Sequence, residues 1–131
     1  MNENGQQQVL EQAARTAERQ RRYRYGAWSE FLAATFLRLK GYRILARRFR
    51  TNCGEIDLVA RRGYRLAFIE VKLRRSFAEA EISISDKQRQ RIRKAADIWL
   101  ARHPPTLETD ICFDVFFVAP WHWPRHLENG L

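Results

Sequence analysis

Cysteine is scarce in this sequence, and only Cys53 and Cys112 occur among its 131 residues. Two cysteines cannot build a disulfide framework, and such scarcity is typical of proteins of the reducing cytoplasm. Long apolar runs are also absent, since none approaches the ~20 residues that a bilayer-spanning helix needs. The start of the chain is polar where a secretory signal would carry an apolar block. We therefore expect a cytoplasmic protein with no membrane partner.

Acidic residues are the minority among the charged residues. The chain has 15 Asp and Glu against 24 Lys and Arg, which gives a formal net charge of +9. The basic residues are concentrated in five segments, at 19–24, 43–50, 61–65, 72–75 and 87–94. Such clusters bind phosphate polymers because they release condensed counterions. Nucleic acid is therefore the expected partner, with DNA favoured, and a basic surface that only aids solubility is the alternative.

The amount of apolar material predicts a folded chain. Hydrophobic residues make up 45% of it, which is ordinary for a globular protein and too much for intrinsic disorder. A chain of this length supports a single core. We assign residues 23–120 to one domain, residues 1–22 to a flexible basic N-terminal tail and residues 121–131 to a C-terminal tail.

Apolar spacing and turn residues predict six elements in the domain. In chain order they are a helix at 27–40, strands at 42–49, 55–60 and 66–73, a helix at 85–103 and a strand at 111–118. Gly41 supplies the stop for the first helix. Ser85 or Asp86 is the expected N-cap of the second helix, and Pro104 lies beyond its end. The αβββαβ order predicts a single α/β domain with a mixed sheet flanked by helices.

The central hairpin brings acidic residues together. With its loop over 62–65, the hairpin places Asp57 directly opposite Glu70. Because side chains alternate along a strand, Glu55 shares that face and lies opposite Lys72. The other face takes the apolar members of both strands, Ile56, Leu58, Ile69 and Val71. Directly opposed like charges destabilise a sheet, so something is expected to offset the repulsion.

A divalent cation would offset it. Mg²⁺ or Mn²⁺ suits a site with two carboxylates plus water and phosphate oxygens, and it can activate water against a phosphodiester. Lys72 lies on the same face and can neutralise the charge that builds on the phosphate. The alternative is a surface salt-bridge ladder in which Lys72 pairs with Glu55 or Glu70. The surrounding basic segments favour catalysis.

Two strings in this hairpin carry a family resemblance. GEIDLVA at 54–60 and FIEVK at 68–72, preceded by a helix bearing Glu30 and by LKGYRILARRFR, resemble the YraN-type uncharacterised proteins of the PD-(D/E)XK nuclease superfamily. The similarity runs from Gly26 to Val118. Ile56 stands where the superfamily's name has a proline.

The resemblance implies a restriction endonuclease-like core and a set of site residues. Asp57 and Glu70 would be the metal ligands, Lys72 the catalytic lysine, and Glu30 would point into the site. Near the substrate the resemblance places two residues of the second helix, Lys87 and Gln88.

We therefore expect a metal-dependent nuclease that hydrolyses phosphodiester bonds. Arg91 and Lys94 of the second helix, together with Arg74 after the hairpin, are expected to bind the nucleic-acid backbone. The alternative is a non-catalytic nucleic-acid-binding adaptor that retains the nuclease fold, and an RNA-binding module also stays open. Two copies could pair as a homodimer to cut both strands of a duplex.

Several other residues could carry chemistry but are interpreted structurally. His122 and His126 have the spacing of two zinc ligands, but neither cysteine is near them in sequence, so no zinc site is assigned. Trp121 and Trp123 could stack on bases, although closing an edge of the core is the preferred interpretation. Asp114 lies in an apolar strand and is expected to pair with an arginine rather than to join the site.

Overall fold

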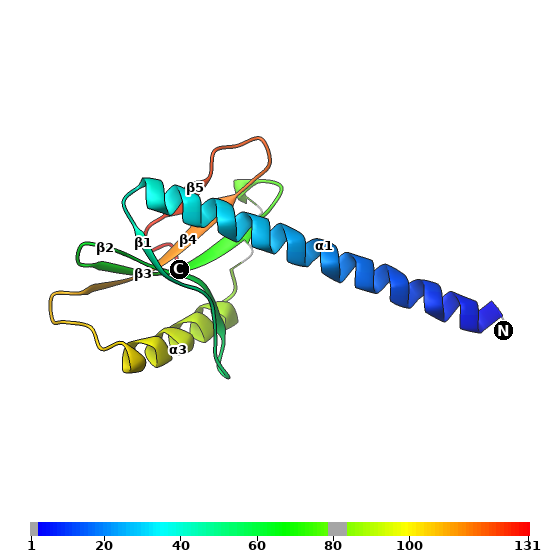
Figure 1. Ribbon diagram of the computed structural model, residues 1–131, viewed down its shortest axis with the longest axis horizontal. Coiled ribbons are helices and arrows are strands. Elements are labelled where there is room, and N and C mark those ends of the chain that lie inside the picture. Colours follow the sequence, from blue (N-terminus) through cyan, green and yellow to red (C-terminus); the bar gives the residue numbers. More distant parts are fainter. Residues whose placement is uncertain (1–2, 79–83) are drawn as a thin grey trace.

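The protein is a single α/β domain built around a five-stranded mixed sheet (Figure 1). The computed structural model describes residues 3–78 and 84–131. Its elements are α1 (Glu3–Leu39), β1 (Arg43–Arg50), β2 (Glu55–Arg62), β3 (Arg65–Leu73), α3 (Asp86–Arg102), β4 (Asp110–Val118) and β5 (Arg125–Leu127). The predicted fold class and the predicted order of helices and strands are confirmed.

The strands lie in the order β1-β2-β3-β4-β5, and β3 and β4 form the parallel pair of the sheet. The β3–β4 connection contains α3, as a crossover between parallel strands requires. In the central hairpin Arg61 pairs with Leu66 and Arg62 with Arg65. The predicted register of this hairpin is therefore confirmed over that part of the ladder.

Helices cover both faces of the sheet (Figure 1). On one face, α1 packs Ala33, Ala34 and Leu37 against side chains that include Leu58 and Phe116. On the other face, the apolar side of α3 packs against β2 and β3. That second layer is made by Ile56, Val59, Leu66, Phe68, Ile92, Ala95, Ala96 and Trp99. The two helices therefore fix the sheet from opposite sides.

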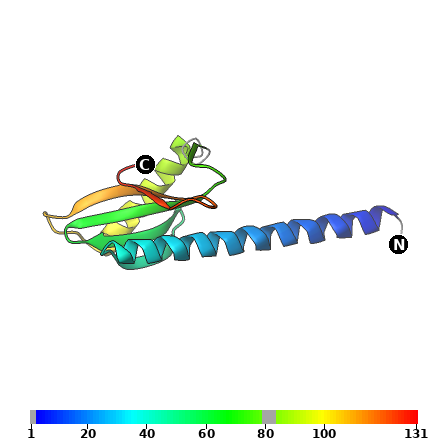
Figure 2. The same ribbon diagram turned by 90° about the horizontal axis from the view of Figure 1, so that it is seen from above.

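Helix α1 begins much earlier than the sequence predicted. It starts at Glu3 rather than at residue 27, and its N-terminal half extends away from the sheet (Figure 2). The segment is rich in Gln, Ala, Glu and Arg, which favour helix, but it lacks the apolar spacing on which the prediction depended. Within the described residues, no helix combines the length and the hydropathy that crossing a membrane requires.

The C-terminal segment also differs from its description as a tail. Residues Arg125–Leu127 form β5 and pair antiparallel with β4. Asp114 anchors this strand, because its carboxylate lies 2.7 Å from His126 Nε2 and accepts from Asn129 N at 2.9 Å. Arg65 donates two further hydrogen bonds to the same carboxylate. The predicted arginine partner of Asp114 is confirmed.

Candidate functional site

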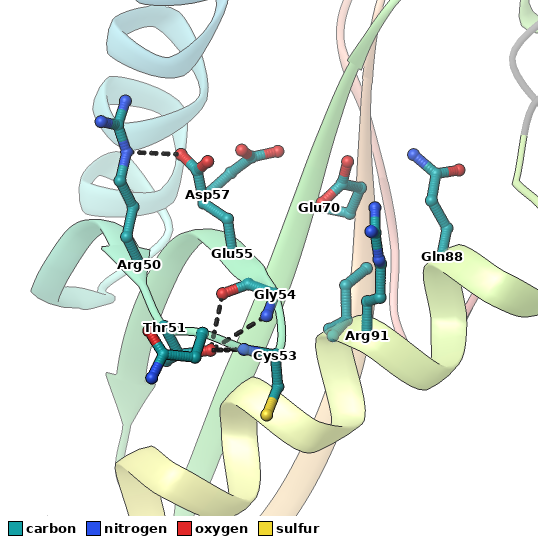
Figure 3. Close-up of a pocket in the computed structure, with 11 residues that line it drawn as sticks. Arg50, Thr51, Cys53, Gly54, Glu55, Asp57, Glu70, Gln88 and Arg91 are labelled. Atoms are coloured by element: carbon teal, nitrogen blue, oxygen red, sulfur yellow. Dashed lines mark hydrogen bonds and ion pairs between the residues drawn. The ribbon is translucent and has the colours of Figure 1, made fainter.

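A cavity of about 470 Å³ opens where the start of β2, the end of β3 and the first turns of α3 meet (Figure 3). Its lining is mostly polar and consists of Arg50, Thr51, Asn52, Cys53, Gly54, Glu55, Asp57, Glu70, Gln88, Arg91 and Ile92. The two residues predicted as metal ligands, Asp57 and Glu70, therefore face the same space.

The turn between β1 and β2 forms one wall of the cavity. Thr51 Oγ1 accepts hydrogen bonds from Cys53 N at 3.1 Å and Gly54 N at 3.0 Å, and it donates to Gly54 O at 2.8 Å. A Cβ atom on Gly54 would lie 2.5 Å from the carbonyl oxygen of Arg91. Only glycine therefore lets this turn approach α3 so closely.

The hairpin becomes irregular where it reaches the cavity. The β2–β3 pairing extends from Arg62 to Leu58, and one residue further the carboxylate of Asp57 accepts from Val71 N at 2.8 Å. On the neighbouring strand Arg48 has a φ of 49°, which is rare outside glycine. The predicted alternation fails here, because Ile56 packs in the α3 layer and not with Leu58.

Burial raises the pKa of both Asp57 and Glu70. Burial and then the charge of Glu70 raise the pKa of Asp57 to about 8. Burial also raises the pKa of Glu70, and nearby Lys72 partly opposes that rise. Both acids therefore hold a proton more tightly than exposed carboxylates do.

Lys72 completes the central cluster. Its Nζ atom lies 3.5 Å from Glu70 Oε1, and the residue is only 6% exposed. Glu55 was predicted to lie opposite Lys72. In the structure Glu55 forms its ion pair with Arg50, whose Nε atom lies 3.6 Å from Glu55 Oε1. Lys72 thus forms an ion pair with Glu70 near the end of β3, and its side chain is buried.

Glu30 lies beside the cavity and is not one of its lining residues. Its carboxylate accepts from Arg48 Nε at 2.7 Å, and its charge contributes to the raised pKa of Asp57. Glu30 was expected to point into the site; its charge acts on Asp57, but its carboxylate pairs with Arg48 and it does not line the cavity. Sequence reasoning missed Arg48, whose position depends on the irregular backbone of β1.

The residues predicted to bind nucleic acid divide into three groups. Gln88 and Arg91 line the cavity and extend from α3 beside Glu70 (Figure 3). Lys87 and Lys94 are exposed on α3, outside the cavity lining. Arg74 follows β3, and its Nη1 donates to Leu73 O at 2.7 Å. Of the predicted cations, Arg91 therefore lines the cavity, and Lys87 and Lys94 lie on the helix that forms its wall. Arg74 does not line the cavity.

Sequence reasoning also missed two lining residues, Thr51 and Arg50. A signal for the turn was present in the Thr-Asn-Cys-Gly string before Glu55, since Thr and Asn side chains often bond to nearby backbone in turns. No comparable signal marks Arg50, because arginines occur throughout β1.

Comparison with known proteins places this chain in a family. The sequence model of "Uncharacterised protein family UPF0102" matches residues 29–118. The chain belongs to the UPF0102 family. A UPF0102 protein of Mesorhizobium japonicum is 54% identical over 115 residues, which cover 88% of this chain and 92% of that protein. A UPF0102 protein of Chelativorans sp. is 51% identical over 111 residues, covering 85% and 90% of the two chains.

The UPF0102 match covers the acidic cluster and the helix beside it. Glu30, Asp57, Glu70 and Lys72 all fall within residues 29–118, as does the whole of α3. The protruding half of α1, the loop after β4 and strand β5 lie outside the match.

Proposed function

We propose that this UPF0102 protein is a metal-dependent nuclease that hydrolyses phosphodiester bonds, with DNA as its expected substrate. The observation that carries the proposal is the placement of Asp57 and Glu70 at a polar cavity that Gln88 and Arg91 also line, with Lys72 paired to Glu70 behind it. The resemblance of the same residues to the PD-(D/E)XK nuclease pattern supports the proposal. Perturbed carboxylates in a cleft are a common property of catalytic sites.

The donor set fits Mg²⁺ or Mn²⁺. Asp57 and Glu70 offer carboxylate oxygens, and each has a raised pKa that a cation would lower. Among the described residues no group of three or more His, Cys, Asp or Glu side chains could enclose an ion. Two carboxylates with water and phosphate oxygens are a normal Mg²⁺ environment. An ion held there would polarise the phosphate and lower the pKa of a bound water.

The other side chains have complementary tasks. Lys72 Nζ can donate to a nonbridging phosphate oxygen, where negative charge increases during attack by water. Arg91 can form a paired hydrogen bond with a neighbouring phosphate, and Gln88 can donate from its amide. The Thr51–Gly54 turn limits access to the carboxylates from the side of β1. Phosphate binding thus orients the scissile bond against the acidic pair.

The test is cleavage of labelled single-stranded, duplex and branched DNA, with an RNA arm, in Mg²⁺, Mn²⁺ or EDTA. The wild type should cut at least one substrate only when metal is present. Asp57→Asn and Lys72→Met should each reduce the rate by roughly 100-fold or more, since each removes a group that stabilises the transition state. Asp57→Asn should keep or raise nucleic-acid affinity, because it removes a negative charge that faces the phosphates.

Asp97→Asn is the matched control, because Asp97 is an exposed carboxylate of α3 outside the cavity lining. It should cut at the wild-type rate. A pure wild-type protein that binds nucleic acid but cuts nothing in either metal would instead establish the non-catalytic adaptor.

A further inference from the structure

The loop after β4 presents two tryptophans to solvent. We call residues 119–124 the tryptophan loop. Trp121 is fully exposed and Trp123 is 80% exposed. The interpretation that these rings close an edge of the core is therefore wrong. Large aromatic rings normally contribute to folding by being buried, so their exposure here needs another reason.

The backbone of the tryptophan loop makes Trp121 more unusual. His122 N donates to Ala119 O at 3.3 Å, which closes a turn with Pro120 and Trp121 at its centre. Trp121 has a φ of 63°. At the third position of a turn, positive φ favours glycine or asparagine, and a bulky residue there is strained. Because its ring is exposed, neither the packing nor the backbone of the turn accounts for a tryptophan at this position.

The neighbours of Trp121 are held in place by ring contacts. The His122 ring lies 5.6 Å from that of Phe77, and the guanidinium of Arg125 lies 4.2 Å from the Phe77 centroid. Trp123 packs its edge against Phe36 at 6.1 Å. The tryptophan loop is thus braced on both sides of Trp121, and the exposed rings are presented from a supported turn.

The tryptophan loop lies beyond the end of the sheet that carries Lys72, where Trp123 contacts α1, whereas the cavity is walled by α3 on the other face. Lys72 pairs with Phe117 on β4, and Phe117 pairs with Arg125 on β5, so these three residues form one row across the strands. Adjacent strands are ~4.8 Å apart, which places the backbone of Arg125 about 10 Å from that of Lys72. Trp123 lies two residues before Arg125, toward the end of the sheet that carries Lys72. In Figure 1 the loop between β4 and β5 leaves the sheet at the end where the β3 arrow points.

Cations accompany the rings at this end of the sheet. Arg74 and Arg75 follow β3 directly, and Arg74 N donates to Val118 O at 3.1 Å, immediately before the tryptophan loop. Exposed aromatic rings beside arginines are the combination by which proteins bind single-stranded nucleic acid, since bases stack on the rings and the cations contact phosphates.

We infer that Trp121 and Trp123 form a stacking surface for unpaired nucleobases, so that the substrate carries a single-stranded segment that passes the end of the sheet where β3 terminates. The inference rests on the proposed function for the identity of the polymer. Bases in an intact duplex already stack on one another and are paired, so their faces cannot reach the rings. Unpaired bases of DNA or RNA offer the same flat face, and separate arms of the experiment distinguish the two.

The experiment measures binding by the full chain in EDTA, so that no substrate is cut. The probes are labelled 20-nucleotide oligo(dT) and oligo(U) and a blunt duplex of the same length. Trp121→Gly is the decisive variant, because glycine suits the positive φ and preserves the turn. Trp123→Ala tests the second ring, and Trp28→Phe, which changes an exposed ring of α1 far from the tryptophan loop in sequence, is the control.

Each loop variant should weaken oligo(dT) or oligo(U) binding by about 5-fold or more, in line with the loss of one stacked base, and should leave duplex binding unchanged. Trp121→Phe should restore most of the affinity, and Trp28→Phe should bind as the wild type does. Quenching of tryptophan fluorescence by the oligonucleotide, lost in a Trp121→Phe, Trp123→Phe double variant, gives a second measurement.

Unchanged single-strand affinity in Trp121→Gly and Trp123→Ala would overturn the inference, and so would equal weakening on the duplex. If metal-dependent cleavage of duplex DNA occurs and is insensitive to both variants, the inference fails while the proposed function stands. If ring-dependent binding of single strands occurs without cleavage in any metal, the stacking surface stands while the nuclease proposal fails. Binding to none of the probes at low salt would reject both.

Discussion

Replacing Asp57 by Asn should stabilise the metal-free protein, and the gain should depend on pH. The substitution keeps the size of the side chain, and the amide oxygen can still accept from Val71 N, which donates to Asp57 at 2.8 Å. The substitution removes the negative charge at position 57, because an amide cannot ionise beside Glu70. The amide nitrogen can also donate to the Glu70 carboxylate, so that repulsion becomes a hydrogen bond.

The size of the effect follows from the pKa. Burial and the Glu70 charge raise the pKa of Asp57 from 3.8 to about 8. A shift of about 4 units corresponds to an upper limit of roughly 6 kcal/mol. Asp57 and Glu70 titrate as a pair, and the buried amide has its own desolvation cost, so a net gain of about 2 kcal/mol at pH 8 is expected.

The direction with pH is equally specific. Because the folded protein holds the Asp57 proton more tightly than the unfolded chain does, it binds more protons between about pH 4 and pH 8. The free energy of unfolding of the wild type should therefore fall through this window as pH rises. Asp57→Asn lacks that contribution, so its advantage should be small near pH 4 and largest near pH 8.

Thermal unfolding in EDTA at pH 5, 6, 7 and 8 measures this. A 2 kcal/mol difference corresponds to roughly 5–10 °C in Tm for a domain of this size. Asp97→Asn, which changes an exposed carboxylate of α3, should show no such trend. Mg²⁺ added at pH 8 should raise the Tm of the wild type and leave that of Asp57→Asn almost unchanged. An Asn variant that is less stable than the wild type at pH 8, or a difference that does not vary with pH, would refute the reasoning.

Two further predictions concern the buried ion pair and the basic helix. Asp114→Asn should lose at least about 2 kcal/mol of stability at neutral pH in urea denaturation, because the partners of this buried carboxylate hold its pKa at about 2. The wild type should lose the same contribution as pH falls from 4 toward 2. A variant as stable as the wild type at pH 7 would contradict this. Arg91→Ala and Lys94→Ala should each reduce the salt dependence of duplex DNA binding by a slope of about 0.9, whereas Arg102→Ala, at the other end of α3, should not; equal slopes in all three variants would remove α3 from the binding surface.

Much of the fold could be predicted because its signals are local. The loop of the central hairpin determines the pairing of Arg61 with Leu66, and Ser85 caps α3 by accepting from Gln88 N at 3.2 Å. Strand β5 and the N-terminal half of α1 could not be predicted in the same way. β5 has only three residues, and its anchor is the contact of His126 with Asp114, which lies 12 residues earlier in the chain. The start of α1 depends on helix propensity without an apolar face.

In the candidate site, too, features with local signals could be predicted and features that depend on distant contacts could not. Asp57, Glu70 and Lys72 belong to one hairpin, so the register set by its loop was enough to predict that they come together, although the alternation of β2 breaks at Ile56. The position of Arg48 beside Glu30 could not be predicted, because it depends on a positive φ in β1 and on an ion pair between two elements. Irregular backbone of this kind arises from tertiary packing and has no signature in residue spacing.

Two aspartates of the same sheet have opposite environments, one typical of a structural carboxylate and one that folding alone does not explain. Although burial alone would raise the pKa of Asp114, donors from Arg65, His126 and Asn129 lower it to about 2. Asp57 receives one backbone donor and faces another carboxylate, and its pKa rises to about 8. Folding stability favours the first arrangement and opposes the second. A cation between the two acids would remove the cost at Asp57, and this is the physical argument for the metal in the proposed function.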